Sequence, residues 1–90
     1  MLPEGYTQVE TTVRAVLADV LGLSPERVAD FRATTPLFGA LPELDSMAVI
    51  SLIAALEEHF DIAIDDDDIS ASTFATLGSL AAFVADKRAP

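Results

Sequence analysis

Three groups of side chains in this 90-residue chain are candidates for chemistry: Ser46, the single histidine His59, and the aspartate run at 65–68. Ser46 follows Asp45, a strong helix N-cap, so we expect it in the first turn of a helix. Backbone N–H groups there lack intrahelical acceptors and form the positive end of the helix dipole, a setting that stabilises a phosphodiester. A serine with a purely structural role also suits a helix start, so the position alone leaves both interpretations open.

Neither His59 nor the aspartates form a complete catalytic or metal motif. A Ser–His triad needs an orienting acid and a nucleophile on convergent loops, and nothing in the sequence marks them, so we interpret His59 as structural or surface-exposed. A calcium loop counted from Asp61 would need glycine at its sixth position and glutamate at its twelfth, where Asp66 and Ser72 stand. We predict no metal site. The aspartates either favour the first turn of a short helix or meet a basic partner surface.

Composition and charge restrict the class of function. Hydrophobic residues make up 51% of the chain, enough for a folded core, and 15 acidic against 5 basic side chains give a net charge of −10. That charge disfavours nucleic acids and anionic membranes as partners and favours proteins with basic surfaces. The chain has no cysteine, which excludes disulfides and thiolate chemistry of its own. With no signal segment and no apolar run of membrane-spanning length, we expect a cytoplasmic monomer that inserts into no membrane.

Periodic apolar residues predict one helix before Ser46, and a short helical turn and a long connection follow it. The first helical stripe consists of Val9, Val13, Val16, Leu17, Val20 and Leu21. Gly22 follows where a left-handed C-cap is expected, and Ser24-Pro25-Glu26 predicts one short helical turn. The long connection over 29–45 is expected to pack on the core through Phe31, Leu37, Phe38, Leu41 and Leu44.

A third helix is predicted from Ser46 to about Phe60. At 100° per residue its core face consists of Val49, Leu52, Ile53, Leu56 and Phe60. The opposite face carries Met47, Ser51, Ala54, Ala55 and Glu58. We expect a short helix from Asp65 to near Ser70 and a final helix over about 74–87. Three main helices and a short one predict an all-α four-helix bundle. We expect a single domain over 1–90, with flexible ends at about 1–6 and 88–90.

The stretch 44–64 resembles the acyl carrier protein family. Leu44-Asp45-Ser46-Met47 is similar to the family's Asp-Ser-Leu motif, and Ala55-Leu56-Glu57-Glu58-His59-Phe60-Asp61-Ile62-Ala63-Ile64 resembles the tail of its second helix. Leu21-Gly22-Leu23 and Phe74-x-x-Leu77-Gly78-Ser79-Leu80 extend the resemblance to both ends of the fold. The resemblance therefore covers nearly the whole chain.

The resemblance implies a carrier that catalyses nothing itself. Ser46 would receive 4′-phosphopantetheine from coenzyme A through a phosphopantetheinyl transferase, and the arm's thiol would hold an acyl group as a thioester. Asp45 would support the helix start, and the fold would shelter the acyl chain between helices. The resemblance also implies contacts with the transferase and with acyl-handling enzymes, both of which would carry basic docking surfaces. The residues implied in these contacts are Met47, Ala54, Glu57, Glu58, Asp65, Asp66, Asp67 and Asp68.

Several positions depart from the family's usual pattern. The segment before Ser46 is Leu41-Pro42-Glu43-Leu44-Asp45, which is one residue longer than in the family and lacks the family's usual glycine. Early in the following helix, Ala48 and Ser51 stand where the family typically has acidic residues. These departures favour a carrier dedicated to a specialised pathway, such as polyketide or unusual lipid synthesis, over general fatty acid synthesis. Two alternatives stay open. One is a peptidyl or aminoacyl carrier of nonribosomal assembly, which more often has histidine where Asp45 stands; the other is a helical interaction module without a prosthetic group.

Overall fold

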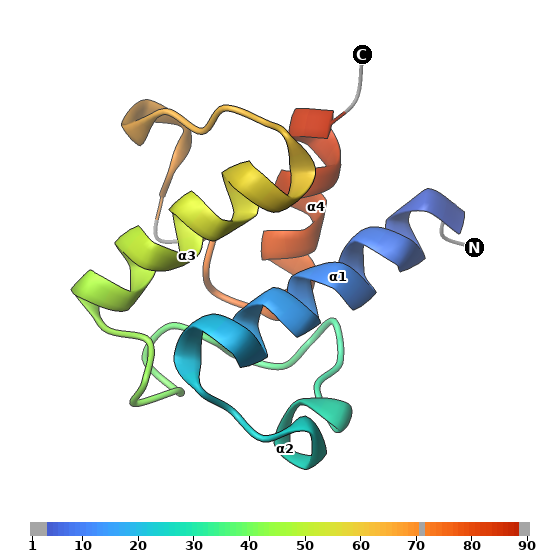
Figure 1. Ribbon diagram of the computed structural model, residues 1–90, viewed down its shortest axis with the longest axis vertical. Helices are drawn as coiled ribbons and strands as arrows, with labels where there is room; N and C mark the ends of the chain where they lie inside the picture. Colours follow the sequence, from blue (N-terminus) through green and yellow to red (C-terminus); the bar gives the residue numbers. More distant parts are fainter. Residues whose placement is uncertain (1–3, 71, 89–90) are drawn as a thin grey trace.

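The computed structural model describes residues 4–70 and 72–88 as a bundle of helices (Figure 1). The elements are α1 (Glu4–Leu21), α2 (Pro25–Ala29), α3 (Ser46–Phe60), the 3-10 helix η1 (Asp66–Asp68) and α4 (Leu77–Arg88). The predicted all-α class is confirmed, since the only strand-like pairing in the described part is an isolated bridge between Pro36 and Thr76. Of the two ends expected to be flexible, residues 4–6 and Arg88 belong to α1 and α4, and the rest lie outside the described residues.

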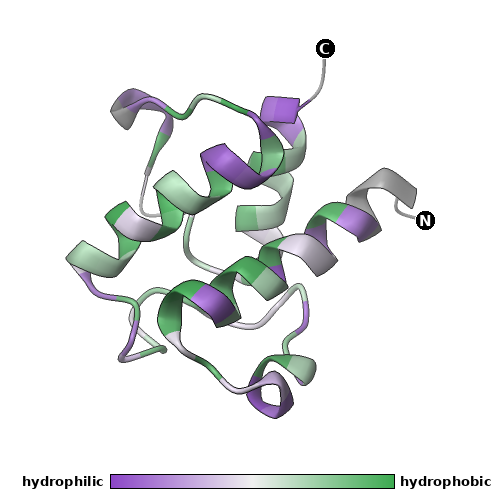
Figure 2. Cartoon of the chain, viewed as in Figure 1, coloured by the Kyte–Doolittle hydropathy of each residue, from purple (hydrophilic) through white to green (hydrophobic). Residues whose placement is uncertain are grey.

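The core lies between α1, α3 and α4, because α1 packs against both of the other long helices. Its largest fully buried side chains are Leu17, Leu37, Leu52, Leu56, Leu77, Leu80, Val13 and Val84. The predicted stripes of α1 and α3 supply half of this set, as burial of a helix's apolar face requires. Figure 2 shows the first part of α3 in green and pale tones, with hydrophilic residues beginning near its C-terminal end.

The helix ends form as the local sequence predicts. The Ser24 side chain accepts a hydrogen bond from the backbone N–H of Arg27 at 3.2 Å, and Asp45 Oδ1 accepts one from Ala48 at 2.8 Å. Gly22 has a φ of +68°, the left-handed conformation that glycine adopts without a steric penalty. These caps fix where α2 and α3 begin and where α1 ends.

The connection before α3 pairs with the segment before α4, which sequence patterns did not predict. Leu37 N–H donates to the Ala75 carbonyl at 3.0 Å, and Phe38 N–H donates to the Phe74 carbonyl at 2.9 Å. On the same side, Gly78 N–H donates to the Ala33 carbonyl at 2.8 Å. The approach is so close that a Cβ on Gly78 would lie 2.8 Å from that oxygen. The absence of a side chain at Gly78 therefore lets these two segments meet.

Three sequence-based expectations need correction. The final helix begins at Leu77, not near Phe74, because Thr76 and Ser79 cap its start reciprocally and Phe74 lies in the paired segment. The short helix after Asp65 ends at Asp68 and is a 3-10 turn. Phe38 was expected in the core but is 53% exposed, whereas the other apolar residues of its connection, Phe31, Leu37, Leu41 and Leu44, are buried as predicted.

Candidate functional site

Ser46 is the first residue of α3, and its side chain is exposed. The first N–H groups of a helix have no intrahelical acceptors, and the capping bond of Asp45 goes to Ala48, two positions further along. The N–H groups of Ser46 and Met47 have no intrahelical acceptor either, and they point along the axis toward the N-terminal end of α3. The dipole of this 15-residue helix places partial positive charge at the same point. The position thus favours a phosphate ester on Ser46.

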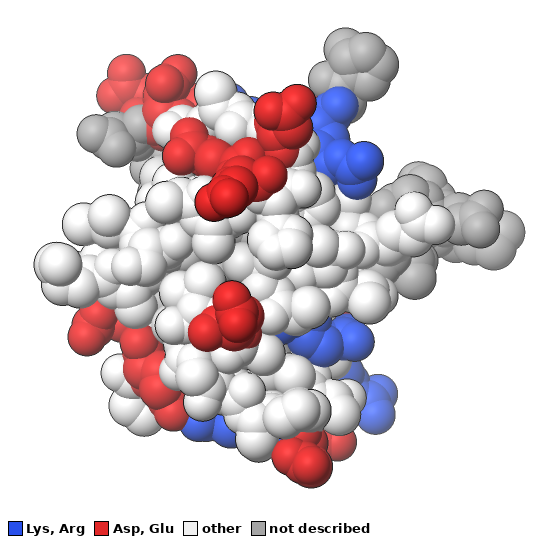
Figure 3. All heavy atoms as spheres, in the orientation of Figure 1, with Lys and Arg blue, Asp and Glu red and all other residues white. Residues whose placement is uncertain are grey.

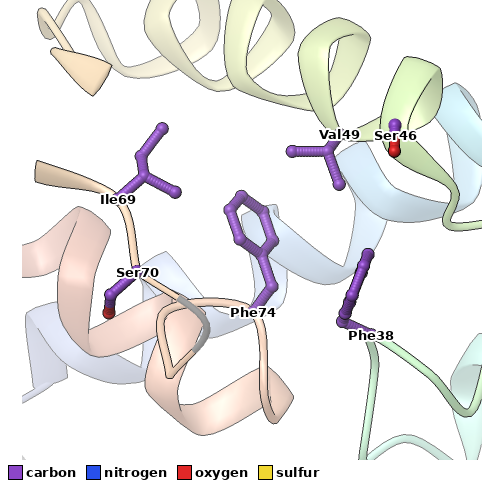
Figure 4. Close-up of a pocket in the computed structure, with 6 residues that line it drawn as sticks. All are labelled: Phe38, Ser46, Val49, Ile69, Ser70 and Phe74. Atoms are coloured by element: carbon purple, nitrogen blue, oxygen red, sulfur yellow. The ribbon is translucent and has the colours of Figure 1, made fainter. Parts of the chain in front are cut away.

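A cavity of about 300 Å³ opens beside Ser46 (Figure 4). Its lining residues are Phe38, Ser46, Val49, Ile69, Ser70 and Phe74. They come from the connection before α3, from the first turn of α3 and from the segment between η1 and α4. In Figure 4 the Phe74 ring lies between Ile69 on one side and Phe38 and Val49 on the other, with Ser46 at the edge. Four of the six side chains are apolar, so the space suits an apolar chain that starts at the serine.

Sequence reasoning did not identify Phe38, Ile69, Ser70 or Phe74 as cavity residues. No local pattern marks them, because they come together only through the pairing of residues 37–38 with 74–75. The one available signal was the aromatic side chain of Phe38, placed in a glycine- and proline-containing connection shortly before Ser46. Val49 was predicted as a core-face residue, and its half-buried side chain lines the cavity instead of filling it.

Two side chains hold the segment that carries Ile69 and Ser70. Glu57 Oε2 accepts a hydrogen bond from the backbone N–H of Ile64 at 2.8 Å, and Lys87 Nζ donates one to Asp68 Oδ2 at 2.6 Å. The bond from Lys87, with a smaller contribution from the Asp65 N–H, lowers the pKa of the Asp68 carboxyl below its usual value. The same bond to Asp68 raises the pKa of Lys87. The segment that leads into this wall of the cavity is thus bound to α3 at Ile64 and to α4 at Asp68.

The residues expected to contact partners fall into two groups. Met47, Ala54, Glu58, Asp65 and Asp67 are exposed, as a contact surface requires. By contrast, Glu57 and Asp68 are half-buried and already bound within the chain, as described above. The side chain of Asp66 lies outside the described part. Figure 3 shows acidic side chains gathered over the C-terminal end of α3 and the segment after it, while the N-terminal half of α3 is without charge on this face.

His59 lies near the opposite end of α3 from Ser46, about 20 Å away along the helix axis at 1.5 Å per residue. Its side chain is exposed, which agrees with the interpretation of a surface histidine and separates it from any reaction at Ser46. Within the described residues, no group of three or more His, Cys, Asp or Glu side chains is arranged to hold a metal ion. Among the same residues, no helix has the length and hydropathy needed to cross a bilayer.

Comparison with known proteins agrees with this geometry. The family described as a phosphopantetheine attachment site matches residues 11–84. An acyl carrier protein of Sulfurovum sp. (strain NBC37-1) is 38% identical over 72 residues, which cover 80% of this chain and 88% of the relative. One of Nitratidesulfovibrio vulgaris (strain DP4) is 40% identical over 60 residues, or 67% of this chain and 74% of the relative.

A solved structure extends the similarity to three dimensions. The solution NMR structure of a holo acyl carrier protein from Nitrosomonas europaea is 57% identical and superposes with a TM-score of 0.79, over 88% of this chain and 93% of the other. The chain therefore belongs to the phosphopantetheine-attachment family. Within that family it is an acyl carrier protein, which carries its cargo on a phosphopantetheine prosthetic group and is not an enzyme. The α3 N-terminus fits such a group, because an exposed hydroxyl, N–H donors and an apolar cavity adjoin there.

Proposed function

We propose that Ser46 is the residue to which the 4′-phosphopantetheine is attached. The observation that carries this proposal is the position of the Ser46 hydroxyl, exposed at the N-terminus of α3 and at the edge of the apolar cavity. Asp45 maintains that position by capping α3 through Ala48. When bound, the prosthetic group supplies a thiol that holds an acyl group as a thioester.

The cavity beside Ser46 supports a role in sheltering the acyl chain. Phe38, Val49, Ile69 and Phe74 offer apolar walls, and Glu57 and Lys87 hold the segment that carries Ile69. Each methylene group that leaves water for these walls contributes about 0.8 kcal/mol. We infer that these side chains bind the part of the acyl chain nearest the thioester and limit the access of water to it.

We further propose that this carrier acts in the cytoplasm as a monomer and serves a specialised branch of fatty acid, polyketide or other lipid synthesis. Its partners would be a phosphopantetheinyl transferase and acyl-activating and acyl-transferring enzymes. The support is compositional: Ala48 and Ser51 stand where general carriers of the family have acids, and the approach to Ser46 through Pro42 and Glu43 is longer. Enzymes that recognise the usual pattern would meet a different surface here.

The test of the attachment site is the intact mass of the chain after incubation with coenzyme A, Mg²⁺ and a broad-specificity phosphopantetheinyl transferase. Wild type should gain one phosphopantetheinyl group, and Ser46→Ala should gain none. Ser70→Ala is the matched control, because Ser70 is another exposed serine that lines the same cavity, and it should gain the group as wild type does. A gain retained in Ser46→Ala would assign the attachment to a different residue.

A further inference from the structure

Three large apolar side chains are conspicuously exposed around Ser46. Phe38, Met47 and Ile50 are 53%, 72% and 63% exposed, and they are the exposed large hydrophobic residues of the described part of the chain. Ile50 follows Ser46 by four residues and Met47 by three, so the side chain of Ile50 neighbours both on the surface of α3. Phe38 reaches the same place from the connection before α3, since it lines the cavity together with Ser46 (Figure 4).

The carboxylates close to Ser46 are bound within the chain. Glu43 forms a two-pronged ion pair with Arg27, with Nη2 and Oε1 3.1 Å apart, and this pairing lowers the pKa of the Glu43 carboxyl. The Asp45 carboxylate caps α3 at Ala48. Neither acid is therefore fully available to a basic side chain of another protein.

The first two-thirds of α3 add no charge of their own. Residues 46–56 contain no acidic or basic side chain, and Glu57, which follows, is bound to the Ile64 N–H. The first exposed carboxylate on α3 is that of Glu58, about 18 Å from Ser46 along the helix axis. Figure 3 shows the same division, with an uncharged surface over the N-terminal half of α3 and acids beyond it.

From these observations we propose that enzymes acting at Ser46 dock mainly through apolar contact with Phe38, Met47 and Ile50, and only secondarily through charge. This inference rests on the proposed function of Ser46. The partner that fits this surface is an enzyme with an apolar depression around its active-site entrance. Its basic side chains would face Glu58, which lies about 18 Å from Ser46 along α3, and the exposed Asp61 and Asp65 beyond it. Buried aromatic and aliphatic anchors of this kind dominate binding energy, whereas exposed charge pairs at a rim add little.

The experiment measures docking separately from modification. The Ser46→Ala chain serves as a competitive inhibitor of a phosphopantetheinyl transferase that modifies the apo acyl carrier protein of Nitrosomonas europaea. Its inhibition constant is compared with those of the same chain carrying, in addition, Phe38→Ser, Ile50→Ser, Glu58→Gln or Ala82→Ser. Ala82 is exposed on α4, so its replacement controls for a general effect of surface change. Circular dichroism verifies that each chain is folded.

We expect Phe38→Ser and Ile50→Ser each to weaken inhibition about five- to tenfold, and Glu58→Gln and Ala82→Ser less than about twofold. Raising NaCl from about 0.05 to about 0.5 M should weaken inhibition by the Ser46→Ala chain less than about threefold. A dominant effect of Glu58→Gln with steep salt dependence, or an absence of inhibition, would overturn the apolar docking surface. Failure of Ser46 as the attachment site would show instead in the intact masses, because wild type would gain no phosphopantetheinyl group or Ser46→Ala would gain one. The two proposals therefore fail separately.

Discussion

The backbone N–H of Phe38 donates a hydrogen bond to the carbonyl oxygen of Phe74 over 2.9 Å, joining the connection before α3 to the segment before α4. Both aromatic side chains border the cavity beside Ser46. A single backbone pairing therefore brings together residues far apart in the sequence and sets the shape of the space next to the attachment site.

Gly78→Ala should destabilise the protein by about 1–3 kcal/mol, because the new Cβ would lie 2.8 Å from the Ala33 carbonyl oxygen. Helix propensity acts in the opposite direction, since alanine is favoured over glycine by up to about 1 kcal/mol. The sign of the change in the free energy of unfolding, measured with urea, decides between these two effects. A variant more stable than wild type would show that the approach of the two segments can relax without cost.

Asp45→Ala should lower the free energy of unfolding by about 1 kcal/mol, because α3 loses the cap that satisfies the Ala48 N–H. Asp45→Asn, which retains a capping oxygen, should stay close to wild type. Urea denaturation of the three chains measures both effects. Equal destabilisation by alanine and asparagine would mean that the negative charge at the helix start, and not the hydrogen bond, is what matters.

The Asp68–Lys87 pair should give the protein a defined acid sensitivity. The pKa of Asp68 is lowered in the folded state, so the pair contributes stability above the ordinary aspartate value of about 4 and loses it as pH falls through the folded pKa. The pKa of Lys87 is raised, so the corresponding alkaline loss begins only above about pH 10.4.

Urea midpoints measured against pH for wild type and Asp68→Asn should therefore differ at pH 7 and converge at about pH 2. Asp67→Asn is the control for relief of charge repulsion, since it removes an exposed neighbouring carboxylate. A difference between wild type and Asp68→Asn that persists undiminished in acid would contradict the assigned cause.

Val49→Phe should reduce the shelter that the cavity gives to an acyl chain, because Val49 lines the cavity and a phenyl ring would occupy part of it. In wild type, octanoyl-loaded protein should melt at a higher temperature than the form without an acyl group, since each buried methylene contributes about 0.8 kcal/mol. The variant should show a smaller increase. Differential scanning calorimetry of both forms of both chains gives the comparison, and an equal increase would place the acyl chain elsewhere.

The sequence by itself determined the features that depend on neighbours along the chain. Asp45 and Ser24 form caps within three residues of themselves, Gly22 ends α1 in a left-handed conformation, and the stripe containing Leu52 and Leu56 turns inward because apolar residues recur at the period of a helix. These interactions are local, so reading the order of residues was enough to place Ser46 at the start of α3.

Only the tertiary structure decided how the surroundings of Ser46 are built. The exposure of Phe38 and the cavity both follow from the pairing of two segments separated by the whole of α3. The family resemblance implied that Glu57 contacts partners, yet its carboxylate accepts a hydrogen bond from the Ile64 N–H. Such contacts join residues whose separation in sequence carries no periodic signal, and the packed chain alone brings them within bonding distance.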